Sequence, residues 1–253
     1  MRLMKRILSA AAVLALSASL LVGCSSGTAS SVPVSASSAA ESTVSSVEET
    51  ASSAVDENEA AAAQLLNDLT GSYQELWPVI LADEYKQTWL DDCTALVGEE
   101  NAEAAFEKLS SMVTSDVYGE DAVEAYANGG GAYFCGFTNS LATLTFDGET
   151  STISGTDKDG NVLFSHTYHY IGMEPVHGLY EFESDDADSG EFTYFFLAPD
   201  TSAETYHIEF RYGSDAEALS QYAYWVASGI STDCDQTMID NCIELFCTEN
   251  LAG

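Results

Sequence analysis

The histidines are the side chains of this chain best suited to hold a metal ion, because neutral imidazole nitrogens are common zinc ligands. The sequence contains His166, His169, His177 and His207. His207 lies in the stretch TYHIEFRYG, residues 205–213, where polar and apolar residues alternate strictly. Such alternation predicts a strand with one solvated face and one buried face.

Thr205, His207, Glu209 and Arg211 share the predicted solvated face, because side chains on a strand repeat with a period of two. His207 and Glu209 are therefore candidate metal ligands. Arg211 on the same face opposes a metal site, because a fixed cation repels a dication. The alternative is that His207 is a solvated or salt-bridged residue on a polar face.

The other histidines are candidates for completing the site. His166 and His169 are three residues apart in SHTYHY, a strand-like run, so we expect them on opposite faces. His177 follows in the loop-like segment GMEPVHG. A site made of His207, Glu209 and one of these histidines is geometrically feasible, and His169 and His177 are taken as the further candidate ligands.

The cysteines give no metal motif. Five of them follow Cys24, an odd number that leaves at least one thiol unpaired or paired between chains. No CxxC spacing occurs, so a structural zinc site built of cysteines is not expected. Their pairing is left open by the sequence. They are Cys93, Cys135, Cys234, Cys242 and Cys247.

The start of the chain predicts export. A basic beginning is followed by an apolar run from Ile7 to Val22, which is short for a membrane span. The run ends in LVGC, which resembles a bacterial lipobox, and small polar residues follow. Residues 1–23 are thus predicted to be a lipoprotein signal peptide, with the lipid carried on Cys24. A plain secretory peptide, the alternative, also places the protein outside the cytoplasm.

Composition separates a tether from a folded domain. Residues 24–57 are mostly Ser, Ala, Thr, Val and acidic residues and have few large apolar side chains, so they are predicted to be a disordered tether. Residues 58–253 are long enough for one domain with a core. The formal net charge is −34, with 41 acidic against 7 basic residues. Such a surface repels nucleic acid, which is therefore not an expected partner.

The hydrophobic patterns predict helices first, then strands, then helices again. Short strand-like runs separated by turn signals fill residues 132–213 without helices between them. This order indicates a mainly β antiparallel meander, closed as a sandwich or small barrel, with flanking helices at both ends. The predicted helices cover residues 58–69, the segment after Pro78, 99–113, 119–131, 215–229 and 234–250.

Three stretches in this order resemble the ZinT/AdcA family of bacterial zinc-binding proteins, which have a calycin, or lipocalin-like, fold. They are LNDLTGSYQELWPVI at 66–80, FFLAPDTSAETYHIEFRYGSD at 195–215, and ALSQYAYWVASGIS at 218–231 followed by a terminal helix. The resemblance implies a calycin-like antiparallel β-barrel over residues 58–253. It also implies an extracytoplasmic zinc-binding protein that passes the metal to an uptake system such as a metal ABC transporter.

The resemblance also implies which residues should hold the metal. The family's zinc site has one histidine before an Ala-Pro pair and then a His-x-His pair. In this chain these positions fall near Phe195 or Phe196, on Thr205 and on His207, so only His207 is retained. The alternative function is a metal-free lipocalin-like module whose barrel mouth, with Phe195 and Phe196, binds a small apolar ligand or a partner. No Gly-rich phosphate loop, GxSxG or HExxH occurs, and an enzyme is not expected.

Overall fold

A computed structural model describes residues 57–114, 133–221 and 225–252 of this chain. These residues lie within one compact unit, residues 43–253. The signal peptide, Cys24, almost all of the tether and the helix predicted at 119–131 fall outside the described residues. Among the helices that the structure describes, none is long and apolar enough to cross a membrane.

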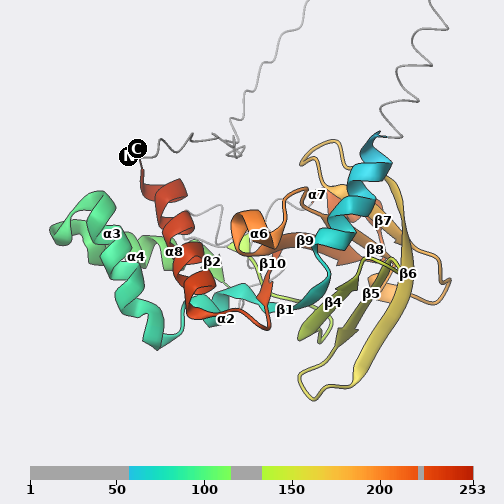
Figure 1. The fold of residues 1–253 in the computed structure, drawn as a ribbon, viewed down its shortest axis with the longest axis horizontal. Coiled ribbons are helices and arrows are strands. Elements are labelled where there is room, and N and C mark those ends of the chain that lie inside the picture. Colours follow the sequence, from blue (N-terminus) through green and yellow to red (C-terminus); the bar gives the residue numbers. More distant parts are fainter. Residues whose placement is uncertain (1–56, 115–132, 222–224, 253) are drawn as a thin grey trace, which may run out of the picture. The chain divides into compact units, whose positions relative to one another are not determined.

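The body of the domain is a closed barrel of eight antiparallel strands in the order β1-β10-β9-β8-β7-β6-β5-β4 (Figure 1). The predicted mainly β fold with an antiparallel barrel and flanking helices is confirmed. Six of the strands follow one another along the chain and pair as neighbours, as the alternating runs predict. They are β4 Thr143–Asp147, β5 Thr152–Thr156, β6 Val162–Met173, β7 Tyr180–Ser184, β8 Tyr194–Leu197 and β9 Ile208–Gly213.

Two strands that the sequence did not predict close the barrel. β1 Gly71–Glu75 pairs with both β4 and β10, and β10 Ala227–Ser231 pairs with β9. The hydrophobic pattern predicted no strand between residue 69 and Pro78, and it predicted a helix up to residue 229, although β10 begins at Ala227, so both predictions are wrong. β1 has only one buried side chain, Tyr73, and β10 is buried on both faces. Neither strand therefore shows the alternation that identifies a strand.

Other predicted elements also differ from the structure. The strand expected near residue 132 is only β3 Tyr133–Phe134, which pairs in parallel with β2 Val113–Thr114 outside the barrel. The strand expected over 205–213 begins at Ile208, because Ser202–Thr205 form the short helix α6 and Tyr206 has a left-handed backbone. A capping box at the start of α6 favours this turn of helix over the strand.

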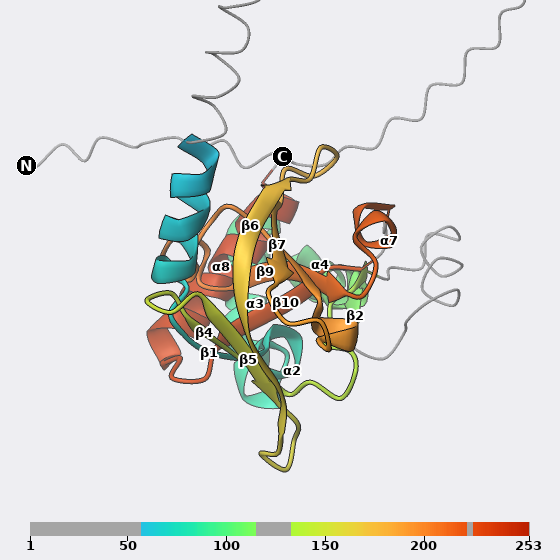
Figure 2. The same cartoon turned by 90° about the vertical axis from the view of Figure 1, so that its right-hand side faces the viewer.

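Helices lie at both ends of the described chain. Residues 57–68 are helical, as predicted, and α7 and α8 follow the meander. Figure 1 shows α3 and α4 together, with α8 between them and the barrel, and these three helices pack on one another. In Figure 2 the long strand β6 crosses the front of the barrel, with α7 on one side and the 57–68 helix on the other. The helices are α2 Leu76–Ile80, α3 Lys86–Val97, α4 Glu99–Ser111, α7 Ala216–Gln221 and α8 Gln236–Leu251, with short 3-10 turns at Asp83–Tyr85 and Gly190–Phe192.

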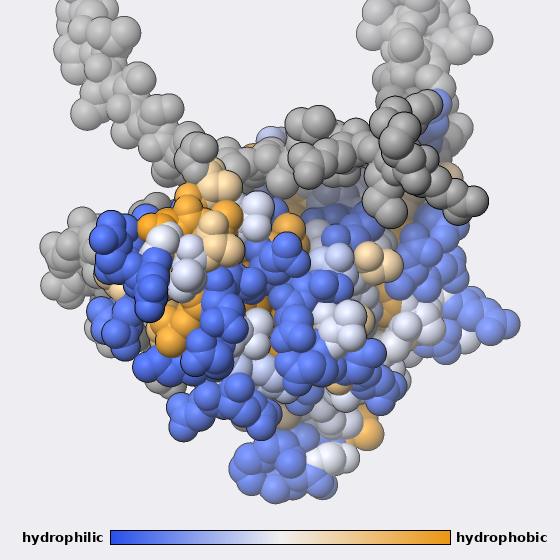
Figure 3. All heavy atoms as spheres, turned by 60° about the vertical axis from the view of Figure 1, so that its left-hand side comes forward, coloured by the Kyte–Doolittle hydropathy of each residue, from blue (hydrophilic) through white to orange (hydrophobic). Residues whose placement is uncertain are grey.

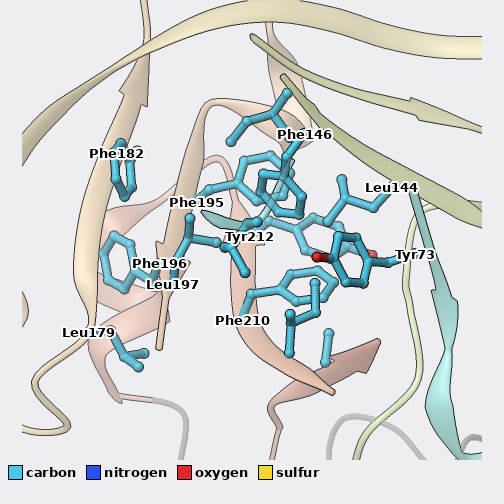
Figure 4. Close-up of a cluster of buried hydrophobic side chains, with 14 of the residues drawn as sticks. Tyr73, Leu144, Phe146, Leu179, Phe182, Phe195, Phe196, Leu197, Phe210 and Tyr212 are labelled. Carbon is cyan, nitrogen blue, oxygen red and sulfur yellow. The ribbon is translucent and has the colours of Figure 1, made fainter. Parts of the chain in front are cut away.

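The barrel interior is filled by aromatic side chains (Figure 4). Phe195 on β8 has no exposed surface, and its ring centroid lies 5.4 Å from those of both Tyr168 and Tyr212. Phe210 and Phe164 also stack against it. Phe195 is therefore a core residue, and an apolar ligand chamber lined by Phe195 is not what the structure shows.

A second core lies outside the barrel, where α2, α3, α4 and α8 pack on the outer face of β10. Ile230 on β10, Cys242 and Ile243 on α8, and Trp89 on α3 are fully buried there. Because of this layer, the outer face of β10 is covered, and so is His207 directly before β9, whereas Glu209 on β9 stays partly exposed. This layer is what creates the candidate site.

Candidate metal centre

His207 lies directly before β9, at the junction between the barrel and α8. Its side chain is enclosed: the residue is 8% exposed and its ring packs near that of Phe246 on α8. Cys242, also on α8, places its Sγ 4.0 Å from Nδ1. The sequence predicted a solvated environment for His207, and this prediction is wrong because Cys242 and Phe246 of α8 enclose its ring.

One backbone hydrogen bond fixes the imidazole ring. His207 Nδ1 donates to the Thr205 carbonyl at 2.8 Å, and the Thr205 hydroxyl donates to the His207 carbonyl at 2.7 Å. This arrangement places a proton on Nδ1 and directs Nε2 away from the backbone. Thr205, which stands at one of the family's ligand positions, therefore orients His207 through its main chain.

Glu209 is the acidic partner of His207. Its Oε1 lies 3.7 Å from His207 Nε2, and its side chain is 44% exposed. Burial lowers the pKa of His207, but hydrogen bonds to Cys242 and Glu209 and their negative charges raise it well above its ordinary value. Partial desolvation raises the pKa of Glu209, but the hydrogen bond to His207 and the positive charges of His207 and Arg211 bring it below its ordinary value. The two side chains therefore form an ion pair.

Two further carboxyl groups share the electrostatic field of this pair. Asp200 follows β8, and Glu249 lies near the end of α8. Burial raises the pKa of both groups, the negative charge of Glu209 raises it further, and the charge of His207 lowers it. The charges of Asp200 and Glu249 are thus coupled to the His207–Glu209 pair. The sequence gives no signal for Asp200 and Glu249, because they come from segments that meet only in the folded chain.

The other candidate ligands have different partners. His169 lies on β6 with its Nδ1 2.7 Å from Asp185 Oδ1, and its side chain is 53% exposed. His177 Nδ1 lies 3.2 Å from Glu174 Oε2 and 3.4 Å from Arg211 Nη1. The structure therefore brings together His207 and Glu209 but shows neither His169 nor His177 in contact with them.

His166 is paired elsewhere as well, and it does not contact His207 in the part of the chain that the structure describes. The Nδ1 of His166 lies 2.8 Å from Asp186 Oδ2. Within the ranges that the structure describes, no group of three His, Cys, Asp or Glu side chains is close enough to hold a metal ion. His207 and Glu209 thus offer a metal two protein ligands as they stand.

The resemblance to the ZinT/AdcA family aligned the first zinc-binding histidine of that family with Phe195 or Phe196. The register of β8 and β9 places these two side chains on opposite faces of the sheet. Phe195 pairs with Tyr212, whose ring it stacks against inside the barrel. Phe196 pairs with Arg211 and, by alternation, lies on the outer face that carries Glu209. Phe196 is therefore the position from which a side chain would point to the same side as the candidate site.

Comparisons with known proteins find solved structures that resemble this chain. No protein-family model matches the chain, and neither does any curated protein. The Zn(II)-bound ZinT-like domain of Streptococcus pneumoniae AdcA is similar in structure, with a TM-score of 0.46 and 16% identity over 71% of this chain and 89% of that chain. The Zn(II)-bound AdcA structure from the same organism matches with a TM-score of 0.42 and 15% identity, over 75% of this chain and 35% of that chain.

The ion pair predicts a pH window for stability. The raised pKa of His207 stabilises the fold fully below the ordinary pKa of 6.5, and this contribution is lost as pH rises through the folded value. The lowered pKa of Glu209 stabilises above 4.5, and its contribution is lost as pH falls through the folded value. We expect His207→Gln to lower the unfolding free energy most between pH 4.5 and 6.5 and less at pH 9. Urea unfolding of both proteins at each pH measures this difference, and a constant difference would contradict the ion pair.

Proposed function

We propose that this chain is a lipid-anchored, extracytoplasmic protein that binds a divalent cation, zinc in preference, through His207 and Glu209. The observation that carries the proposal is the orientation of His207. Its Nδ1–H is held by the Thr205 carbonyl, and its Nε2 faces the Glu209 carboxylate at 3.7 Å. A backbone carbonyl on one ring nitrogen is the usual support for a metal bound to the other.

The spacing of the two ligand atoms fits a tetrahedral zinc ion. With Zn–N and Zn–O distances of about 2.0–2.1 Å, two ligands of one tetrahedral ion lie about 3.3 Å apart. The distance between His207 Nε2 and Glu209 Oε1 is 3.7 Å. A small rotation of the partly exposed Glu209 side chain closes the gap. Imidazole with carboxylate oxygen also suits zinc better than it suits magnesium or calcium.

The acidic surroundings supply the rest of the attraction. Asp200 and Glu249 have raised pKa values, partly because Glu209 repels their negative charge. A bound dication would attract these carboxylates instead. They could approach the coordination positions of the ion that His207 and Glu209 leave to water. Arg211 weakens the attraction for a cation, because its positive charge already compensates part of the negative charge of Glu209. The proposed site is therefore weak compared with a site of three histidines.

The proposed activity is binding and delivery rather than catalysis. The lipobox-like LVGC sequence and the acidic tether support an anchor at Cys24, from which the domain meets metal ions outside the cytoplasm. The ZinT/AdcA resemblance of the motifs supports delivery of the ion to an uptake transporter of the ABC type. The absence of nucleic-acid partners follows from a charge of −34.

Zinc titration of residues 43–253 by calorimetry tests this function. We expect one zinc ion to bind, and His207→Ala to weaken binding at least tenfold, because it removes the nitrogen ligand. Glu209→Gln should weaken it by a similar factor. His169→Ala is the matched control, since it removes an exposed imidazole paired with a single aspartate. It should change the affinity less than twofold.

A thiol control is needed because five cysteines are present in this unit. Cys242→Ser removes the sulfur nearest to His207, and in the proposed site it leaves zinc binding at Nε2 intact. Binding that survives His207→Ala, or that is lost equally in His169→Ala, would show that this site does not hold the metal. The scaffold would then have kept the barrel without its zinc chemistry.

A further inference from the structure

Two buried thiols face each other between α3 and α8. Cys93 on α3 and Cys247 on α8 have no exposed surface, and their sulfur atoms lie 3.9 Å apart. These two helices pack side by side in Figure 1. The residues are 154 positions apart in the sequence, so the contact is a product of the tertiary fold.

We propose that Cys93 and Cys247 form a disulfide bond that ties the terminal helix α8 to α3. A disulfide has an S–S distance of about 2.05 Å, so the two sulfurs must approach by about 2 Å in total. Rotation of the two side chains about their Cα–Cβ bonds provides such a movement without a change in helix packing. The other thiols have different surroundings: Cys242 faces His207, Cys135 adjoins Ser228 and Trp77, and Cys234 precedes α8.

The bond forms by exchange with a disulfide oxidant. One thiolate of the pair attacks a sulfur of the oxidant and releases one of its thiols. The second thiolate then attacks the mixed disulfide, forms the Cys93–Cys247 bond and releases the other thiol. The protein loses two electrons and two protons, and the oxidant gains them. An extracytoplasmic location permits this chemistry, so in the cell the bond depends on the proposed export.

The buried setting determines when the exchange takes place. Burial raises the pKa of the Cys93 thiol, although its hydrogen bond to Cys247 lowers it, and burial also raises the pKa of the Cys247 thiol. The reactive thiolates are thus scarce once α8 has docked. The bond therefore forms while α8 is docking during folding, and afterwards the same enclosure protects it from reductants.

The disulfide would also secure one wall of the candidate metal site. Cys247 directly follows Phe246 and lies five residues beyond Cys242, the two α8 residues that enclose His207. Fixing α8 against α3 holds this wall in place. It also closes a loop of 154 residues, and long loops gain most from a cross-link because it restricts the unfolded chain.

Refolding of residues 43–253 in oxidised glutathione, followed by thiol counting under denaturing conditions and peptide mapping, tests the bond. We expect three of the five thiols to remain reactive and a linked pair of peptides that contain Cys93 and Cys247. The melting temperature should fall by about 5–10 °C when dithiothreitol is added. Zinc affinity is measured separately, so failure here does not decide the metal site.

Two variants separate this bond from other pairings. Cys93→Ser should leave four reactive thiols and a melting temperature that dithiothreitol does not change. Cys234→Ser, the matched control, should leave two reactive thiols and the same linked peptides. Five reactive thiols in the refolded wild-type chain, or linked peptides that join other cysteines, would overturn the proposal. The thiol count and the linked peptides of the wild-type chain decide the proposal even where a variant does not fold.

Discussion

Replacement of Arg211 by alanine should destabilise the domain by about 3–5 kcal/mol. Arg211 is only 4% exposed, although it lies on the outer face of β9. Its Nε donates to the Trp225 carbonyl at 3.1 Å, and its Nη1 donates to the Leu219 carbonyl at 2.8 Å. The substitution leaves two buried carbonyls without these donors and removes the packed stem of the side chain.

Arg211 is also linked to a buried acidic residue through His177. Its Nη1 lies 3.4 Å from His177, whose ring and backbone N–H contact Glu174. Glu174 has no exposed surface, so loss of the nearby cation leaves a buried carboxylate less well compensated. Arg211→Lys keeps the charge but not the two-pronged donor geometry, and we expect an intermediate loss.

Urea unfolding of wild type, Arg211→Ala and Arg211→Lys measures these losses. Lys158→Ala is the control, because Lys158 is a surface residue paired only with its neighbour Asp159 in the interactions that the structure shows. It should unfold with the wild-type midpoint. An Arg211→Ala variant as stable as the control would mean that the guanidinium is hydrated rather than structural.

Replacement of Phe195 by alanine should cost a similar amount, about 3–5 kcal/mol, because it opens a cavity in a filled barrel. Phe195 is fully buried among Phe164, Tyr168, Phe210 and Tyr212. Together with Phe195 on β8, these rings come from three strands, β6, β8 and β9, so their mutual packing helps to hold the barrel closed. Phe195→Leu should lose less, since it retains most of the buried volume.

This variant also distinguishes the filled barrel from a ligand chamber. Thermal unfolding of Phe195→Ala beside Val162→Ala, a change at a side chain exposed on β6, measures the difference. If Phe195 lined an open apolar chamber, truncation would barely change stability and would increase binding of an apolar dye. We expect a large drop in the melting temperature for Phe195→Ala and almost none for Val162→Ala.

The surface explains why the acidic composition is compatible with a stable domain. Hydrophilic residues cover most of the side of the molecule that carries α3 and α4 (Figure 3). A hollow of about 280 Å³ on this side is lined by Thr88 and the carboxylates of Asp91, Asp92, Asp240 and Glu244. Burial, and the negative charges of Glu244, Asp240 and Asp91, raise the pKa of Asp92. The like charges are thus placed at the surface, where solvent and salt screen them.

The sequence by itself determined the barrel-forming meander and most of the helices. Strands β4 to β7 alternate between a more buried and a more exposed face, and helices such as α4 and α8 bury one stripe, so their periodicity is visible locally. The sequence also identified His207 and Glu209 as neighbours on one face, because that relation requires only the period of two.

Only the tertiary structure decided how the barrel closes and what surrounds His207. β1 and β10 are strands because their partners lie far away in sequence, and β10 is covered on both faces. Likewise, α8 buries His207, which local alternation marks as solvated. Burial by a distant segment leaves no periodic signal in the strand that is buried. The tertiary structure therefore determines the partners of His207, the direction of its pKa shift and the enclosure of its ring. The identity of the candidate ligands, a histidine and a glutamate two residues apart, can be read from the sequence.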